Sequence, residues 1–147
     1  MSNTRRFHLR GLLAATLGIM AASAASADES GIKVVYHLSE GVQQASRAIG
    51  NIRNHLNAEP KTKIIVVTHG PGIDFLLDGA ENAAGQPFAG AIGELSGRGV
   101  EFRVCNNTLV SRKIPADRVV MEAKVVPSGV AEVTKLQARE SYAYLKP

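Results

Sequence analysis

The chain has 147 residues, of which 45% are hydrophobic, and a formal net charge of +4 from 17 basic and 13 acidic residues. Three of the basic residues are arginines within the first ten positions, so the rest of the chain is nearly neutral. A nearly neutral domain lacks the basic surface that nucleic-acid binding and attachment to anionic membranes require, which disfavours both of these function classes.

The first 27 residues have the pattern of an export signal. A basic segment, TRRFHLR, precedes the apolar run of residues 11–24 and the small-x-small cleavage site Ala25-Ser26-Ala27. The apolar run is too short to span a bilayer as a mature helix, which disfavours an uncleaved membrane anchor. The paired arginines resemble a twin-arginine signal, and the ordinary Sec route is the alternative. We therefore expect a periplasmic protein with one mature domain over residues 28–147.

Strands and helices alternate along the mature chain. Residues 32–38 (IKVVYHL) and 63–68 (KIIVVT) are apolar and rich in β-branched side chains, as expected for strands covered on both faces. Between them, Ser39 is expected to cap a helix that runs to about Leu56, with an apolar stripe at helical spacing. The small-residue stretch 79–90 contains glycine and proline breakers and predicts a loop with short helical pieces.

The second half of the chain continues this alternation. A helix is predicted at residues 91–96, a strand at residues 100–105 and a shorter strand around residues 124–126. Ser128 is expected to cap a helix over residues 129–140, and residues 142–145 form the last candidate strand. Strand–helix–strand units of this kind form right-handed crossovers and parallel sheets. We therefore predict an α/β, three-layer sandwich with a mostly parallel sheet of about five strands.

Three chemically reactive side chains lie at the ends of predicted strands. His37 comes near the end of the first strand, His69 follows the second, and Cys105 ends the third. The carboxyl ends of parallel strands share one edge of a sheet, where open α/β folds bind their ligands. In a flavodoxin-like strand order of 2-1-3-4-5 the first and third strands are neighbours. That order predicts that His37 lies beside Cys105.

Cys105 is the only cysteine in the chain, so it has no partner for an intramolecular disulfide. In an exported protein, an unpaired thiol points to pairing between chains or to chemical reactivity. Backbone N–H groups of the following turn, and of any short helix near Asn107, would stabilise a thiolate. Free cysteines are also among the most buried residues, so a purely structural role is the alternative.

We take Cys105 as the candidate catalytic nucleophile and four neighbouring residues as candidate substrate ligands. His37 and His69 belong to this set because histidine titrates near neutral pH. Arg103 lies two residues earlier on the same face of the strand, and Asn106 begins the polar turn after it. A zinc or copper site of two histidines and one cysteine is an alternative, although these residues lack tight ligand spacing.

Several common cofactor and enzyme motifs are absent from the sequence. The HGPG segment, residues 69–72, has neither the GxGxxG nor the GxxxxGK[ST] spacing of phosphate-binding loops. The sequence also contains no GxSxG elbow and no HExxH pair, which disfavours a serine hydrolase and a zinc protease. We predict no bound cofactor, and we expect Gly70 and Gly72 to adopt backbone conformations that mainly glycine accepts.

Three segments, in order, resemble the DsrE/DsrF-like family. They are NIRNHLNAEPKTKIIVVTHGPGIDFLL, GVEFRVCNNTL and VVPSGVAEVTKLQARESYAYLKP, the last with a terminal aromatic strand. The resemblance covers nearly all of residues 32–147. It implies a flavodoxin-like α/β domain, commonly assembled into trimers or hexamers, and a role in sulfur relay. Self-association is also expected from the apolar YAYL edge.

By this resemblance, Cys105 is the candidate carrier of a persulfide that passes between small sulfur species or thiol-bearing protein partners. His37, Arg103 and Arg112 would then hold an anionic donor such as thiosulfate or a polysulfide. The first alternative is a non-catalytic oligomeric module of the same fold that binds a small ligand or partner at the same edge. The second is a periplasmic metal-binding protein.

Overall fold

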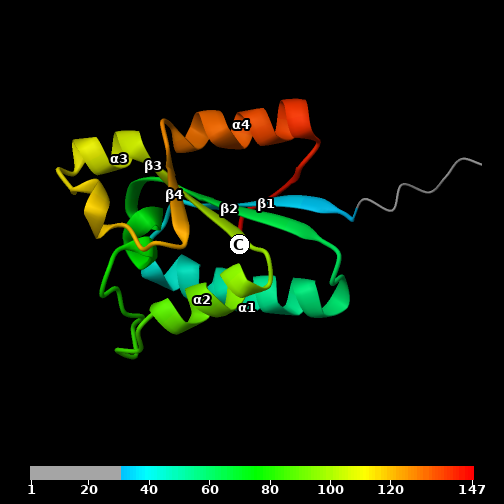
Figure 1. Cartoon of the computed structure of the whole chain (residues 1–147), viewed down its shortest axis with the longest axis horizontal. Helices are drawn as coiled ribbons and strands as arrows, with labels where there is room; N and C mark the ends of the chain where they lie inside the picture. Colours follow the sequence, from blue (N-terminus) through cyan, green and yellow to red (C-terminus); the bar gives the residue numbers. More distant parts are fainter. Residues whose placement is uncertain (1–30) are drawn as a thin grey trace, which may run out of the picture.

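The structure is a computed structural model that describes residues 31–147, and the predicted export signal lies outside this part of the chain. The described residues form a five-stranded sheet with helices on both faces (Figure 1). The strands are β1 (Lys33–Leu38), β2 (Lys63–Thr68), β3 (Glu101–Cys105), β4 (Ala123–Val126) and β5 (Ala143–Leu145). The helices are α1 (Val42–Ala58), α2 (Ala89–Gly97), α3 (Asn106–Ser111) and α4 (Gly129–Glu140), with 3-10 turns η1 (Gly70–Leu76) and η2 (Ala116–Arg118).

The predicted flavodoxin-like three-layer α/β sandwich is confirmed, but the strand order differs from the expected one. All strand pairs are parallel, in the order β4-β3-β2-β1-β5. β2 therefore separates β1 from β3, whereas the order 2-1-3-4-5 would make them neighbours. Alternation of strands and helices predicts parallel pairing, but it does not fix which edge each new strand joins. Here α4 crosses the sheet from β4 at one edge to β5 at the other.

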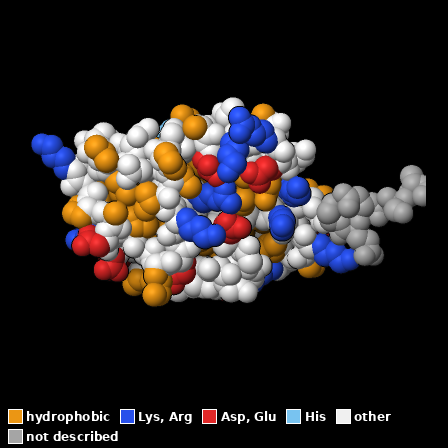
Figure 2. Space-filling view, turned by 45° about the horizontal axis from the view of Figure 1, so that its top comes forward, with side chains coloured by type: hydrophobic (Ala, Val, Ile, Leu, Met, Phe, Trp, Pro, Cys, Tyr) orange, Lys and Arg blue, Asp and Glu red, His pale blue; other side chains and the backbone are white. Residues whose placement is uncertain are grey.

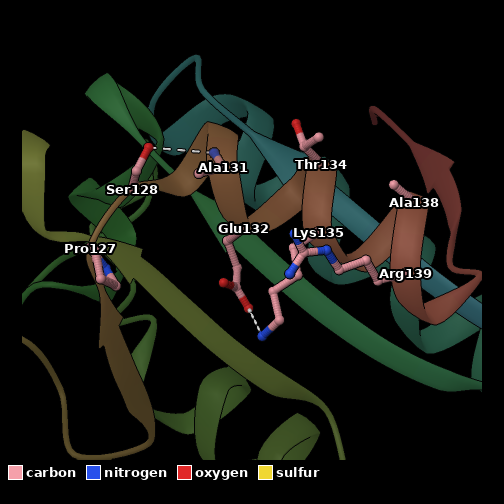
Figure 3. Close-up of a pocket in the computed structure, with 8 residues that line it drawn as sticks. All are labelled: Pro127, Ser128, Ala131, Glu132, Thr134, Lys135, Ala138 and Arg139. Carbon is pink, nitrogen blue, oxygen red and sulfur yellow. Dashed lines mark hydrogen bonds and ion pairs between the residues drawn. The ribbon is translucent and has the colours of Figure 1, made fainter.

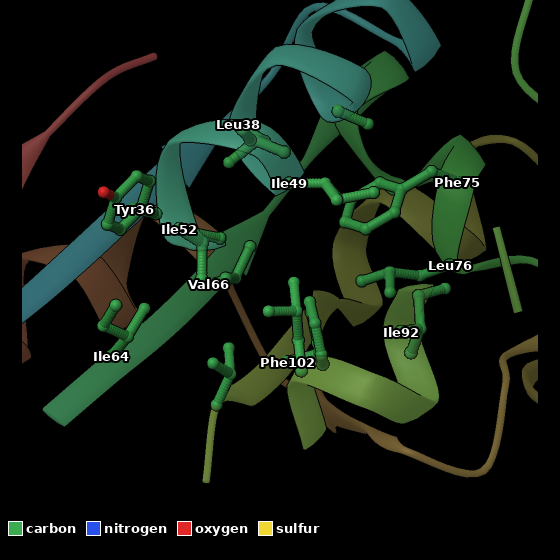
Figure 4. Packing of buried hydrophobic residues seen from close by; sticks show 14 of the residues in the cluster. Tyr36, Leu38, Ile49, Ile52, Ile64, Val66, Phe75, Leu76, Ile92 and Phe102 are labelled. Carbon is green, nitrogen blue, oxygen red and sulfur yellow. The ribbon is translucent and has the colours of Figure 1, made fainter. Parts of the chain in front are cut away.

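The two faces of the sheet are packed unequally. On one face, α1, α2 and η1 enclose a cluster of twenty buried residues that includes Tyr36 and Phe102 (Figure 4). On the other face, α4 covers a cluster of six buried residues, Val35, Ile65, Val67, Val133, Leu136 and Tyr142. Side chains alternate between the faces along a strand, so His37, Arg103 and Cys105 belong to the α4 face. No helix within residues 31–147 is long and apolar enough to cross a membrane.

Local capping explains where the helices begin. Ser128 caps α4 as predicted. α1 begins at Val42, and Ser39 does not cap it. Instead, the buried side-chain oxygen of Gln44 accepts hydrogen bonds from the backbone N–H groups of Ser39 and Glu40, at 2.7 and 2.9 Å. This acceptor satisfies two backbone donors and fixes the loop that follows β1.

The two glycines of the HGPG segment serve different purposes. Gly70 has a φ angle of 53°, in the left-handed region that was expected for it. Gly72 does not share that conformation. A Cβ atom at Gly72 would lie only 2.2 Å from the carbonyl oxygen of Leu38, so glycine is required for space. η1 can therefore pack directly against the end of β1.

Candidate functional site

Three of the predicted site residues lie together at the carboxyl edge of the sheet, below the start of α4. Cys105 is the last residue of β3, His69 directly follows β2, and His37 is the next-to-last residue of β1. Because β2 is the central strand of these three, His69 lies between the other two. The ring centroids of His37 and His69 are 4.8 Å apart. The expectation that His37 directly adjoins the Cys105 strand is wrong, since it depended on the other strand order.

The Cys105 thiol is buried but surrounded by hydrogen-bond donors. The residue is 4% exposed. The backbone N–H groups of Gly129, Thr108 and Asn107 and the Thr108 hydroxyl each act to lower the pKa of this thiol. Burial raises the pKa of the Cys105 thiol, but the four donors together outweigh burial and hold this pKa below its ordinary value. The thiolate is therefore more accessible here than in an ordinary cysteine.

Gly129 allows α4 to begin in direct contact with this thiol. A Cβ atom at Gly129 would lie 3.0 Å from the Thr68 carbonyl oxygen, 3.1 Å from the His69 Cβ and 3.2 Å from the Cys105 Cβ. These distances are shorter than ordinary van der Waals contacts, so any side chain here would push the helix start away from the strand ends. His69 and Cys105 thus both border the first turn of α4.

The two histidines form a neutral pair, in which His69 is the member on the strand next to that of Cys105. The Nδ1 atom of His37 is hydrogen bonded to the Tyr144 hydroxyl at 2.8 Å. Its Nε2 atom is buried and has no hydrogen-bond partner within the described part of the chain. Burial, followed by the charges of His69 and Lys146, lowers the pKa of His37. Burial and then Lys146 lower the pKa of His69. Both rings are therefore neutral at neutral pH, and each offers one donor and one acceptor nitrogen.

Arg103 lies on the same face as Cys105, but carboxylates already bind it. Its guanidinium is paired with Glu132 of α4 and, at 2.9 Å, with Glu101 of β3. The Arg103 and Glu132 side chains are only 16% and 12% exposed. This pair fastens α4 to the sheet near the site. The role of Arg103 as a substrate ligand stays a prediction.

The other polar candidates lie further towards the surface. Asn106 is the first residue of α3 and is exposed, and its role as a substrate ligand also stays a prediction. Arg112 donates to the Asp74 carboxylate at 2.6 Å and to the Gly70 carbonyl oxygen at 3.3 Å. These bonds join the end of α3 to η1 and support the turn around the thiol.

The metal-binding alternative gains no support from the geometry. No group of three His, Cys, Asp or Glu side chains within residues 31–147 is placed to hold a metal ion. A groove of about 530 Å³ follows the outer side of α4, between Ser128 and Arg139 (Figure 3). Cys105 and the two histidines do not line this groove. The candidate site is therefore the edge beneath the start of α4.

Three residues that contribute to the site were not found from the sequence. The Thr108 hydroxyl accepts a hydrogen bond from the Gly70 N–H at 2.9 Å, and Thr108 also acts to lower the pKa of the Cys105 thiol. Gly129 and Tyr144 make the contacts described above. The polar turn after the third strand and the Ser128-Gly129 helix start were visible signals for the first two. The Tyr144 contact could be foreseen only from the strand order, which places β5 next to β1.

The comparisons with known proteins agree with this architecture. The sequence profile of the DsrE/DsrF-like family matches residues 10–147. A solved protein of unknown function, MTH1491 from Methanobacterium thermoautotrophicum, is 30% identical with a TM-score of 0.70, over 79% of this chain and 99% of that chain. The ychN protein from E. coli is 12% identical with a TM-score of 0.66 over the same shares, which shows the fold alone. No curated protein sequence matches significantly.

Proposed function

This chain belongs to the DsrE/DsrF-like family, and membership of this family supports a role related to sulfur relay. We propose that the chain is a sulfur carrier that holds a persulfide on Cys105. One observation carries the proposal: the only thiol of the chain lies at the carboxyl edge of the sheet, directly beside the start of α4 at Gly129, in surroundings that lower its pKa. A thiolate is the reactive form in sulfur transfer. Fold alone does not specify this chemistry, so the proposal depends on the site.

The proposed reaction has two balanced steps. The Cys105 thiolate attacks the outer sulfur of a sulfane donor, a new S–S bond forms, and the S–S bond of the donor breaks. The electron pair of the broken bond leaves with the rest of the donor. An acceptor thiolate then attacks the outer sulfur of the persulfide, and the electron pair returns to Cys105. The donors around the thiolate assist the second step, because a thiol with a lower pKa is a better leaving group.

The location and partners belong to the same proposal. The leader pattern supports action in the periplasm, as a sulfurtransferase-like carrier between small sulfur species or thiol-bearing proteins. Self-association is supported by Tyr144, which is 45% exposed on the edge strand β5. We propose a homo-oligomer with no bound cofactor.

The burial of the thiol favours a second candidate function. At 4% exposure, Cys105 fits a structural residue in a non-catalytic module that binds a small ligand or partner at the same edge. In that case the neutral histidine pair would bind the ligand, and the thiol would only fill the space below α4.

Intact-mass analysis distinguishes the two functions. The purified chain is treated with a polysulfide or with thiosulfate, next to a Cys105→Ala control. A carrier gains one sulfur that dithiothreitol removes, and the variant gains none. If the native chain gains no sulfur, and N-ethylmaleimide does not alkylate its thiol without denaturant, the carrier function is wrong and the binding module is favoured.

A further inference from the structure

The cation closest in the chain to the thiol is not free to bind a substrate. Arg103 lies two residues before Cys105 on the same face of β3, within reach of a donor at the thiol. Glu132 and Glu101 both pair with its guanidinium. Because the Arg103 and Glu132 side chains are 84% or more shielded from solvent, exchanging this carboxylate for a substrate anion would leave the shielded Glu132 charge with only Lys135, at 3.9 Å, as its partner.

Two other basic side chains that border the edge are also paired. Arg112 is bound by Asp74 at 2.6 Å. Lys146, whose charge lowers the pKa of both histidines, is paired with Glu40. Figure 2 shows basic and acidic side chains next to one another in the middle of the visible face. Each of these three basic side chains near the edge thus already has a carboxylate partner.

What surrounds the sulfur is a set of neutral donors. The backbone N–H groups of Gly129, Thr108 and Asn107 act to lower the pKa of the thiol, Gly129 starts α4 next to Cys105 and His69, and the His37 ring lies 4.8 Å beyond that of His69. Such donors can stabilise a single negative charge on sulfur. Neutral donors do not compensate a dianion for the water that it loses in a shielded site. Such an anion requires cationic partners there.

The small space at the thiol also disfavours a dianionic donor such as thiosulfate. Cys105 is 4% exposed, and the first turn of α4 approaches so closely that a Cβ at Gly129 would lie 3.2 Å from the Cys105 Cβ. A tetrahedral sulfonate group is bulkier than a single sulfur atom. It would have to enter beside the thiol and leave again as sulfite.

From these observations, and resting on the proposed carrier function, we propose that Cys105 takes sulfur from small sulfane donors without a sulfonate group, of the hydrodisulfide and polysulfide class, and selects against thiosulfate. With hydrodisulfide, the thiolate and HSS⁻ give the Cys105 persulfide anion and HS⁻, and the electron pair of the broken S–S bond leaves with hydrosulfide. With thiosulfate the leaving group is the sulfite dianion, which the paired arginine does not stabilise.

The test measures rate constants for Cys105 persulfidation of the full chain by hydrodisulfide and by thiosulfate at one neutral pH. The ratio of the two is compared with the same ratio for N-acetylcysteine, which corrects for the intrinsic reactivity of the donors. We expect the ratio for the protein to exceed that of the free thiol by at least about tenfold. A protein ratio equal to or below that of N-acetylcysteine would overturn the inference.

A pair of variants on α4 tests the electrostatic cause. Glu132→Gln removes one carboxylate from Arg103 and is expected to raise the ratio of the thiosulfate rate to the hydrodisulfide rate several-fold. Glu140→Gln is the matched control, because Glu140 pairs with Lys135 and not with Arg103. Equal ratios in both variants would also overturn the inference. A chain whose thiol is alkylated by N-ethylmaleimide yet takes sulfur from neither donor would instead contradict the carrier function itself.

Discussion

The two faces of the sheet differ in what they contribute to the molecule. The face under α1 and α2 buries twenty residues in one continuous cluster, and the face under α4 buries six. The site groups described above, Cys105, His37, His69 and Arg103, lie on the α4 face or at its edge. The larger cluster therefore supplies most of the hydrophobic stabilisation, because the hydrophobic free energy scales with the apolar area removed from water.

This difference shows how a small domain can accommodate a polar site. A thiol, two histidines and an ion pair are poor substitutes for a hydrophobic core, since buried polar groups stabilise little even when they are paired. The α4 face can hold them because the opposite face stabilises the sheet. Elements with few buried contacts also open locally at lower free energy than the rest of the fold. We expect α4 to be such an element.

The largest expected effect comes from truncating each cluster in turn. Phe102→Ala, in the larger cluster and 1% exposed, is expected to lower the free energy of unfolding by about 3–5 kcal/mol. Leu136→Ala, in the smaller cluster and fully buried, is expected to cost about 2–3 kcal/mol, because α4 can move to close part of the cavity. Urea unfolding followed by circular dichroism measures both. An equal or larger loss for Leu136→Ala would contradict the proposed division between the faces.

A second comparison uses one Arg–Glu ion pair from each face. Glu132→Gln weakens the shielded pair with Arg103 and is expected to cost about 1–3 kcal/mol, since Arg103 keeps Glu101 as a partner. Glu94→Gln breaks the exposed pair with Arg53 on the α1 side, and no measurable change is expected there. Hydrogen exchange should show faster exchange of α4 amides in Glu132→Gln only. If the two variants are equally stable, the shielded pair does not fasten α4.

A third comparison uses two helix glycines. Alanine at Gly50 of α1 meets open space and is expected to stabilise the protein by about 0.5–1 kcal/mol, because alanine is the better helix former. Gly129→Ala should instead displace the start of α4 and so weaken the effect of the Gly129 N–H group on the thiol pKa. The midpoint of thiolate absorbance in a pH titration should therefore rise in Gly129→Ala and stay unchanged in Gly50→Ala. An unchanged midpoint in both would show that the Gly129 amide does not tune the thiol.

The smallest expected effect is a pH dependence that belongs to the α4 face. The folded-state pKa values of His37 and His69 are lowered from 6.5 by burial and by nearby positive charge, so below that pH the folded state binds fewer protons than the unfolded chain. Their stabilising contribution is thus complete above about pH 6.5 and declines as the pH falls towards the folded-state pKa values. In the double variant His37→Gln and His69→Gln, the free energy of unfolding should change less with pH between about pH 7 and pH 5 than in the native chain. If the free energy of unfolding depends on pH equally in the variant and the native chain, the pKa values of the two histidines are not lowered by folding.

Local sequence signals predicted most of the elements. β-branched runs predicted β1 and β2, and Ser128 predicted the first residue of α4, because these signals depend on residues close in the chain. The order of the strands was not predictable in this way. Where β5 pairs is decided by the crossing of α4 over the sheet, and this crossing depends on how much apolar surface each face leaves for a helix.

The site was predictable to a similar extent. Cys105, His37 and His69 could be assigned to one edge because the strands are parallel. Their order along the edge, with His69 in the middle, required the strand order. The close approach of Gly129 and the neutralisation of Arg103 by Glu132 join residues far apart in the chain, and no local pattern predicts such contacts.

The hydrogen bond between His37 and Tyr144 joins residues 107 positions apart, and this separation has a consequence for the protein during its synthesis. On the ribosome, Cys105 emerges before Gly129 and well before β5, so the nascent chain carries an uncovered thiol until its last segments can pair. Closing so long a loop is slow compared with forming the helices. If the proposed export takes place, the chemical state of the thiol depends on the route of translocation. A chain folded before export covers its thiol in a reducing compartment, whereas a chain threaded through the membrane unfolded presents that thiol to the oxidants of the periplasm.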